Sequence, residues 1–304
     1  MDLSFSINLM GNLGIMFAMI VLGYIAKPKK ESLEDIAKLV INYGIPALIF
    51  SAFVLEFNID MLLSMSAVLL FALGSTIVGY GVSLLVIKAG KIDKKMQPEF
   101  LIATAYGNTG FIGIPVSLAV FGREGALLAA VFDFGVSFVV FTLGLFLLAG
   151  SKQGSITEAF KSLINPPIIA FAVGLVFAIA NIPIPHLAMT GINMLGAMAP
   201  PLAMLFIGGM LSHVGKIQFP IKAMVSLVLT RLIFIPLAMV VFIKIFGIAG
   251  MMAGVILLQS ATPTMVAAPL LCQRYLGNAT FSTSAVFITT LLCIITIPLV
   301  MLLL

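Results

Sequence analysis

The residues best suited to bind a ligand lie in two short stretches that interrupt long apolar runs. The first reads Ala105-Tyr-Gly-Asn-Thr-Gly-Phe-Ile-Gly-Ile-Pro115, and the second reads Gln259-Ser-Ala-Thr-Pro-Thr-Met-Val-Ala-Ala-Pro269. Glycine and proline disfavour continuous helix, and proline also removes a backbone donor. Unpaired backbone in hydrocarbon is costly, so such breaks persist only where protein or a watery cavity surrounds them. The two breaks therefore predict a binding site, the alternative being that these residues only kink the helices for packing.

The chemistry of the breaks favours an anion. Each is expected to start a second half-helix near the membrane centre, and a helix N-terminus carries about half a positive elementary charge with free N–H donors. We expect a small organic anion as substrate, and the candidate contacts are Asn108, Thr109, Gly110, Pro115, Thr262, Pro263, Thr264 and Pro269.

Two isolated charges also lie deep in apolar sequence. Asp133 is about 13 Å into the fifth run and Arg231 about 15 Å into the eighth, counting 1.5 Å per residue. A charge at this depth costs at least roughly 2.5–3.5 kcal/mol and normally has a partner or a function. In the functional interpretation, Arg231 pairs with the substrate or a coupling carboxylate and Asp133 carries a proton. The structural alternatives are an Asp133–Arg231 pair, or separate bonds to backbone carbonyls.

Coupling to Na⁺ is less expected than coupling to protons or uncoupled export. A Na⁺ site needs several oxygen ligands, usually including a carboxylate. Gln259 and the hydroxyls after it offer oxygens, but no Asp or Glu lies in the ninth run or in the first break. We expect no metal site and no cofactor, because Cys272 and Cys293 both lie in apolar sequence without neighbouring histidines.

These residues must be positioned by membrane-spanning helices. Of the 304 residues, 62% are hydrophobic and 9% are charged, whereas a soluble domain is about 25% charged. The apolar runs last about 20 residues, the length that crosses a bilayer. We expect an all-α polytopic membrane protein embedded in the lipid bilayer, with ten transmembrane helices at about 6–26, 33–55, 61–87, 99–121, 125–149, 165–182, 191–212, 221–245, 249–274 and 279–303.

The charge distribution orients these spans. Thirteen Lys and Arg residues fall on one side of the ten-span arrangement, and only Arg123 and Lys244 fall in loops on the other. Since Lys/Arg-rich loops stay cytoplasmic, both termini should be extracytoplasmic in the inner or plasma membrane. The basic residues form no patch or arm of the kind that binds nucleic acid. Asp133 is the only acid expected at mid-membrane, so the paired groups that an intramembrane enzyme needs are lacking and we expect no enzyme.

A repeated spacing divides the chain in two. Pro46 and Pro200 are 154 residues apart, and so are Pro115 and Pro269. A repeat with five spans must insert its second copy upside down, as in many secondary transporters. We expect a first five-helix repeat at 1–150, a short cytoplasmic linker at 151–164 and an inverted second repeat at 165–304.

Three segments resemble the auxin efflux carrier family. They are Gly107-Asn-Thr-Gly-Phe-Ile-Gly-Ile-Pro115 with Gly122; Asn165-Pro166-Pro167 with Gly174-Leu175; and Ala261-Thr-Pro263 through Pro269 to Tyr275. The resemblance implies a scaffold from spans 1, 2, 6 and 7, and a transport domain from spans 3–5 and 8–10 that moves like an elevator. It also implies that spans 4 and 9 cross at their breaks, with Asn108 contacting substrate.

Two other functions are compatible with the sequence. The related bile acid–sodium symporter fold suggests a sodium-coupled symporter, and a membrane sensor could reuse a transporter fold. The glycine pair Gly208-Gly209 permits close helix contact, and a homodimer through the scaffold is a further alternative.

Overall fold

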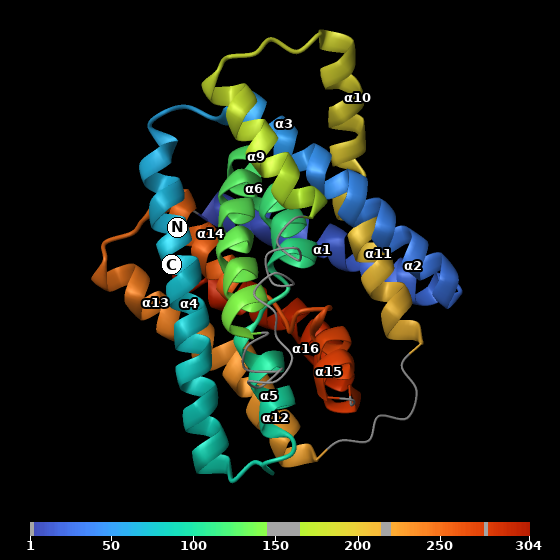
Figure 1. The fold of residues 1–304 in the computed structure, drawn as a ribbon, viewed down its shortest axis with the longest axis vertical. Coiled ribbons are helices and arrows are strands. Elements are labelled where there is room, and N and C mark those ends of the chain that lie inside the picture. The colour runs from blue at the N-terminus through green and yellow to red at the C-terminus, as the bar shows by residue number, and fades with distance from the viewer. Residues whose placement is uncertain (1–2, 145–164, 214–219, 277–278) are drawn as a thin grey trace. The chain divides into compact units, whose positions relative to one another are not determined.

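The computed structural model describes residues 3–144, 165–213, 220–276 and 279–304, where nearly all regular structure is helical (Figure 1). The predicted linker at 151–164 and the end of the predicted fifth span lie outside these residues. The helices of the first half are α1 (Leu3–Ala26), α2 (Lys30–Leu39), α3 (Ile45–Glu56), α4 (Met61–Gly90), α5 (Gln97–Ala105) and α6 (Ile114–Val139). Those of the second half are α9 (Pro166–Ile179), α10 (His186–Ala197), α11 (Ala199–Ser212), α12 (Ile221–Leu229), α13 (Ile235–Ile245), α14 (Gly250–Ser260), α15 (Ala268–Leu276) and α16 (Thr280–Met301).

In the part of the chain that the structure describes, six helical segments are long and apolar enough to cross a membrane by length and composition: Lys30–Glu56, Met61–Gly90, Thr109–Val139, His186–Ser212, Ile221–Ile245 and Thr280–Met301. Shorter apolar helices occur at Gly14–Ala26, Pro166–Ile179 and Gly250–Ser260. The described chain is therefore a multi-pass membrane protein, as the composition predicts. Each of the ten predicted spans overlaps at least one helix. The boundary predicted between the fourth and fifth spans falls at Gly122, whose φ of 71° and ψ of −163° interrupt α6.

Three π-helical turns precede helices that begin with an Ile-Pro pair. They are Val40–Gly44 before α3, Thr109–Gly113 before α6 and Thr230–Phe234 before α13. Proline lacks the N–H of an ordinary helical bond, and its ring clashes with the preceding turn. A wider turn relieves that clash: the N–H of Ile235, next to Pro236, donates to the carbonyl of Thr230, five residues back. The same widening places Arg231 inside the turn.

The chain forms two compact units that are described separately. Unit 1 consists of the described residues of Met1–Val68, Gly110–Val131 and Ile164–Val214. Unit 2 consists of the described residues of Leu69–Thr109, Phe132–Leu163 and Gly215–Leu304. The boundary between them cuts the first break between Thr109 and Gly110.

Unit 1 is held together by close contacts between helices. α1 packs along α11, and α3 packs against α9 and α10 (Figure 1). A Cβ atom at Gly208 would overlap the backbone of Ile20 in α1, so only glycine allows this approach. The ring of Phe53 in α3 contacts the ring of Phe171 in α9 at a centroid distance of 4.8 Å. Gly208 thus serves contact within the chain, whereas the sequence left dimer contact as an alternative.

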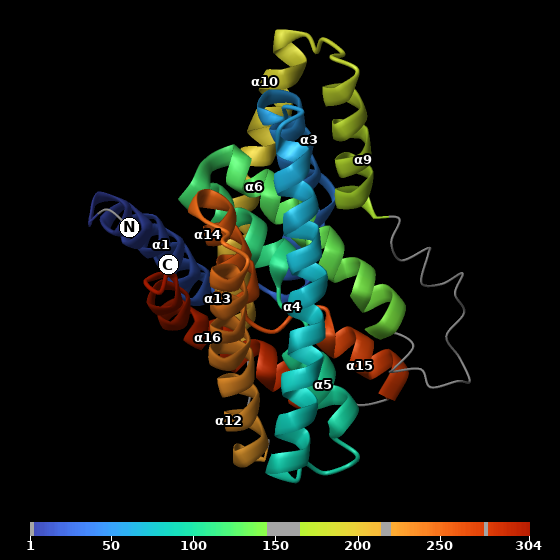
Figure 2. The ribbon, with the colours of Figure 1, turned by 90° about the vertical axis from the view of Figure 1, so that its left-hand side faces the viewer.

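Unit 2 has an apolar cluster where α5, α12 and α16 meet. Phe100 of α5 stacks on Phe281 of α16 at a centroid distance of 6.1 Å, and Met224 and Leu227 of α12 complete the cluster. The α12–α13 segment runs beside the part of α4 that belongs to this unit (Figure 2), with the ring of Phe246 5.7 Å from that of Phe71. This packing positions α5 and α14, the two helices that end at the breaks.

Candidate functional site

The extended residues of the two breaks pair with one another in unit 2. The first break follows α5 and the second follows α14. Asn108 donates its backbone N–H to the carbonyl of Pro263 at 2.8 Å, and Met265 donates to the carbonyl of Tyr106 at 3.1 Å. Between them, Gly107 and Thr264 form an isolated antiparallel bridge. Each break therefore satisfies backbone groups of the other, which lowers the cost of leaving the helical conformation.

The threonine side chains of the second break mainly hold backbone. The hydroxyl of Thr262 donates to the carbonyl of Gln259 at 2.7 Å, and that of Thr264 donates to the carbonyl of Ala103 at 2.8 Å. The backbone N–H of Thr264 donates to the hydroxyl of Thr289 in α16 at 3.0 Å. Both threonines are fully buried. Their hydroxyl protons are thus already engaged in fixing the shape of the break.

Asn108 differs from these threonines because part of its side chain is unpaired. The residue is 3% exposed, and its Nδ2 atom is buried without a hydrogen-bond partner. Leaving a buried donor unpaired costs about 1–3 kcal/mol. The Nδ2 group can therefore donate to an acceptor that enters the break.

Asp133 lies beside the same break. The hydroxyl of Thr109 donates to its Oδ1 atom at 2.5 Å, and the aspartate side chain remains partly exposed. Thr109 directly follows Asn108, so the segment that carries the unpaired amide is bonded to the Asp133 carboxylate at its next residue. The sequence predicted both residues separately but gave no indication of this link.

Arg231 is 3% exposed and donates to backbone carbonyls at the ends of two helices. Its Nε atom donates to the carbonyl of Thr262 at 2.7 Å, and Nη2 donates to the carbonyl of Ser260 at 3.0 Å and the hydroxyl of Thr262 at 3.3 Å. Nη1 donates to the carbonyl of Thr104 at 3.4 Å. In the described residues, the ion pairs within 4.0 Å are Lys38–Asp35 and Arg123–Glu56. Of the structural alternatives, Arg231 has the backbone bonds rather than the pair with Asp133.

The remaining predicted residues are divided between the units. Gln259 is fully buried in the last turn of α14, and Pro269 is the second residue of α15. Gly110 and Pro115 belong to unit 1, in the π-helical turn and the first turn of α6. The residues that unit 2 brings together are Asn108, Thr109, Asp133, Arg231, Gln259, Thr262, Pro263 and Thr264.

Glu99 is a structural anchor that was not predicted from the sequence. It is 3% exposed in the first turn of α5. It accepts hydrogen bonds from the backbone N–H of Ser282 at 2.8 Å and from the Ser282 hydroxyl at 2.9 Å. Its carboxylate therefore caps the N-terminus of α16 as well as lying at the start of its own helix, where a negative charge is favourable. An acid just after Pro98 is a helix-start signal that could have revealed it.

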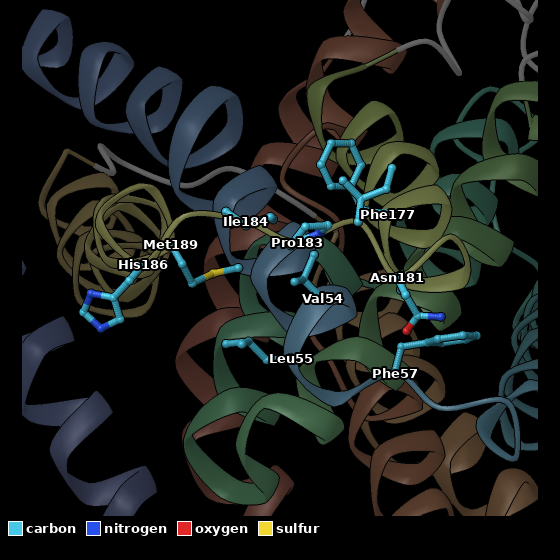
Figure 3. Close-up of a pocket in the computed structure, with 11 residues that line it drawn as sticks. Val54, Leu55, Phe57, Phe177, Asn181, Pro183, Ile184, His186 and Met189 are labelled. Carbon is cyan, nitrogen blue, oxygen red and sulfur yellow. The ribbon is translucent and has the colours of Figure 1, made fainter.

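A separate cavity lies in unit 1. It has a volume of about 440 Å³ and is lined by the end of α3, the end of α9 and the start of α10. Figure 3 shows Phe57 and Asn181 at one side of it and His186 and Met189 at the other. None of the predicted site residues lines this cavity.

The comparisons with known proteins agree on a transporter. A family model described as membrane transport protein matches residues 8–301. An uncharacterised transporter of Methanothermobacter thermautotrophicus is 26% identical over 293 residues, covering 92% of this chain and 93% of the relative. An uncharacterised transporter of Methanocaldococcus jannaschii is 25% identical over 300 residues, covering 94% and 95%.

Proposed function

We propose that this chain, which belongs to the membrane transport protein family, carries a small mono- or dicarboxylate-like anion across the cytoplasmic membrane. The observation that carries the proposal is the buried, unpaired Nδ2 atom of Asn108 within paired breaks. A carboxylate oxygen is the acceptor that such a donor lacks. The N-terminus of α15, which follows the second break, adds a positive partial charge.

The proposed transport cycle is alternating access of the elevator type. In it, two inverted five-helix repeats form a scaffold from spans 1, 2, 6 and 7 and a moving domain from spans 3–5 and 8–10, with both termini extracytoplasmic. The 154-residue offset between proline pairs supports the repeat. The antiparallel pairing of Gly107 with Thr264 supports a crossing of spans 4 and 9. The substrate would bind where these two spans meet.

We further propose that Asp133 couples transport to protons. A carboxylate bonded to Thr109, next to Asn108, disfavours an anion while it is charged. Protonation removes that repulsion, so anion and proton would bind together. Asp133→Asn should then retain uptake down a substrate gradient but lose uptake driven by a pH gradient alone, measured in proteoliposomes.

The direct test of the proposal is Asn108→Ala in the purified full-length protein. A hydrogen bond to a charged group contributes about 1.5–3 kcal/mol, so the apparent affinity for a carboxylate should fall about 10- to 150-fold. Uptake of labelled mono- and dicarboxylates into proteoliposomes measures this. Asn108→Asp, which places a negative charge at the same position, should weaken uptake further.

A matched control is Asn193→Ala, in α10 of unit 1, where the side chain is partly exposed. It should leave uptake and affinity unchanged. Replacing the carboxylates by their neutral amides should abolish uptake in the unmodified protein. Wild-type affinity in Asn108→Ala, or equal uptake of acid and amide, would exclude Asn108 as the anion contact.

A further inference from the structure

Arg231 is a buried cation that has no acidic partner among the described residues, and the proposed transport function leaves it unused. Arg231 donates four hydrogen bonds, and all of its acceptors are neutral: the carbonyls of Thr104, Ser260 and Thr262 and the hydroxyl of Thr262. Arginine stays protonated in proteins. A full positive charge therefore lies among oxygen atoms that carry only partial charges.

Those oxygens stand at two helix C-termini. α5 ends at Ala105, directly after Thr104, and α14 ends at Ser260. Each C-terminus carries about half a negative elementary charge, so two of them balance about one positive charge. In other transporters with broken helices, unwound carbonyls and half-helix C-termini of this kind coordinate Na⁺. In this protein, the guanidinium group of Arg231 bonds to the carbonyl oxygens at these helix ends.

The space for this group is built into the first break. A Cβ atom at Gly107 would overlap both the Nη2 atom of Arg231 and the Oγ1 atom of Thr262. Gly107 also forms the bridge with Thr264. The glycine therefore allows the backbone to approach the guanidinium group while remaining paired with the other break.

We propose, resting on the proposed transport function, that Arg231 is a tethered cation that takes the place of a dissolved coupling metal ion. It joins the ends of α5 and α14 and thereby holds the paired breaks in shape. The intact protein consequently binds its anion without Na⁺. Removing the guanidinium group leaves an oxygen-lined space that a dissolved cation, guanidinium or Na⁺, fills.

The test uses thermal unfolding of the purified full-length protein in the absence of substrate. For the wild type, replacing choline chloride by NaCl at constant ionic strength should not change the unfolding midpoint. Arg231→Gly should lower the midpoint, and guanidinium chloride at millimolar concentration or NaCl should restore most of the loss in a saturable manner. Urea, which has a similar shape but no charge, should restore none of it.

Two further variants keep the test decisive if Arg231→Gly fails to fold. Arg231→Lys retains a positive charge and should unfold at a higher temperature than Arg231→Met, which has similar length without charge. Equal midpoints for these two variants overturn the proposal, as does a midpoint of Arg231→Met equal to that of the wild type. Failure of both cations to rescue a folded Arg231→Gly, or saturable stabilisation of the wild type by Na⁺, also overturns it.

The cation response can be separated from anion transport. Asn108→Ala should show the same indifference to Na⁺ as the wild type, because the acceptors of Arg231 are oxygens of Thr104, Ser260 and Thr262 and none belongs to Asn108. If the wild type fails to carry carboxylates but guanidinium or Na⁺ restores the unfolding midpoint of Arg231→Gly, the proposed substrate is wrong and the role of Arg231 stands. If carboxylates are carried but neither cation restores the midpoint, the proposed substrate stands and the proposed role of Arg231 is wrong.

Discussion

Gly107→Ala is a small change that should disturb the paired breaks strongly. The backbone itself accepts alanine, since the described glycines with positive φ are Gly122, Gly247 and Gly250. The obstacle is steric, because the added methyl group would occupy the space of the Arg231 Nη2 atom and the Thr262 hydroxyl. The guanidinium group must move away, and the two bonds that its Nη2 atom makes at the end of α14 are lost.

The size of the effect follows from the bonds that break. Nη2 makes two of them, at 3.0 Å to the carbonyl of Ser260 and at 3.3 Å to the hydroxyl of Thr262. Hydrogen bonds to charged groups contribute about 1.5–3 kcal/mol each, so losing both costs about 3–6 kcal/mol. Alanine returns about 0.4–1 kcal/mol by restricting the unfolded chain. We expect a net loss of about 2–6 kcal/mol in the free energy of unfolding.

The assay compares the unfolding midpoint and carboxylate uptake of Gly107→Ala with those of Gly81→Ala. Gly81 lies in α4 with no heavy atom within 4 Å of a Cβ placed there, so its replacement should be neutral or slightly stabilising. In an Arg231→Met background, Gly107→Ala should cost less, because the overlap with the guanidinium group is absent and only the overlap with the Thr262 hydroxyl remains. Wild-type stability and uptake of Gly107→Ala, or an equal cost in both backgrounds, would refute the reasoning.

Three further substitutions test contacts within each unit. Glu99→Ala leaves the Ser282 N–H and hydroxyl without their acceptor and should cost about 3 kcal/mol, with Glu99→Gln costing less, measured by thermal unfolding. Thr264→Val removes the donor to the carbonyl of Ala103 and should cost about 1–3 kcal/mol, while Thr264→Ser should retain most of the stability. Gly208→Leu should separate α1 from α11. Its rate of cleavage by an added protease should then exceed that of Gly81→Ala at the same protease concentration.

Much of the fold was predictable because its signals are local. Long apolar runs predicted the membrane helices, and the Gly-Asn-Thr-Gly motif with Pro115 predicted the first break, which the structure has at residues 106–108. The resemblance to the auxin efflux carrier family is confirmed by the family match over residues 8–301. Gly122 also ends a helical segment where a span boundary was predicted.

The contacts between segments were not predictable in the same way. The bridge between Gly107 and Thr264 joins short extended segments that carry no periodic pattern, and only the repeated proline spacing suggested that the breaks correspond. For Arg231, the sequence left open whether its partner is Asp133 or backbone carbonyls. Its depth in an apolar run indicated a partner, but which oxygens it meets depends on where two distant helices end.

The partners of Arg231 also limit what it can do for the substrate. Four of its donor positions are taken by oxygens at the ends of α5 and α14, and those helix ends offset its charge. An arginine that paired with the anion would have to give up these bonds at each transport step. We therefore expect the anion to be held by neutral donors, with Asn108 first among them. Such a site binds less tightly than an ion pair, which suits a carrier because its substrate must also leave.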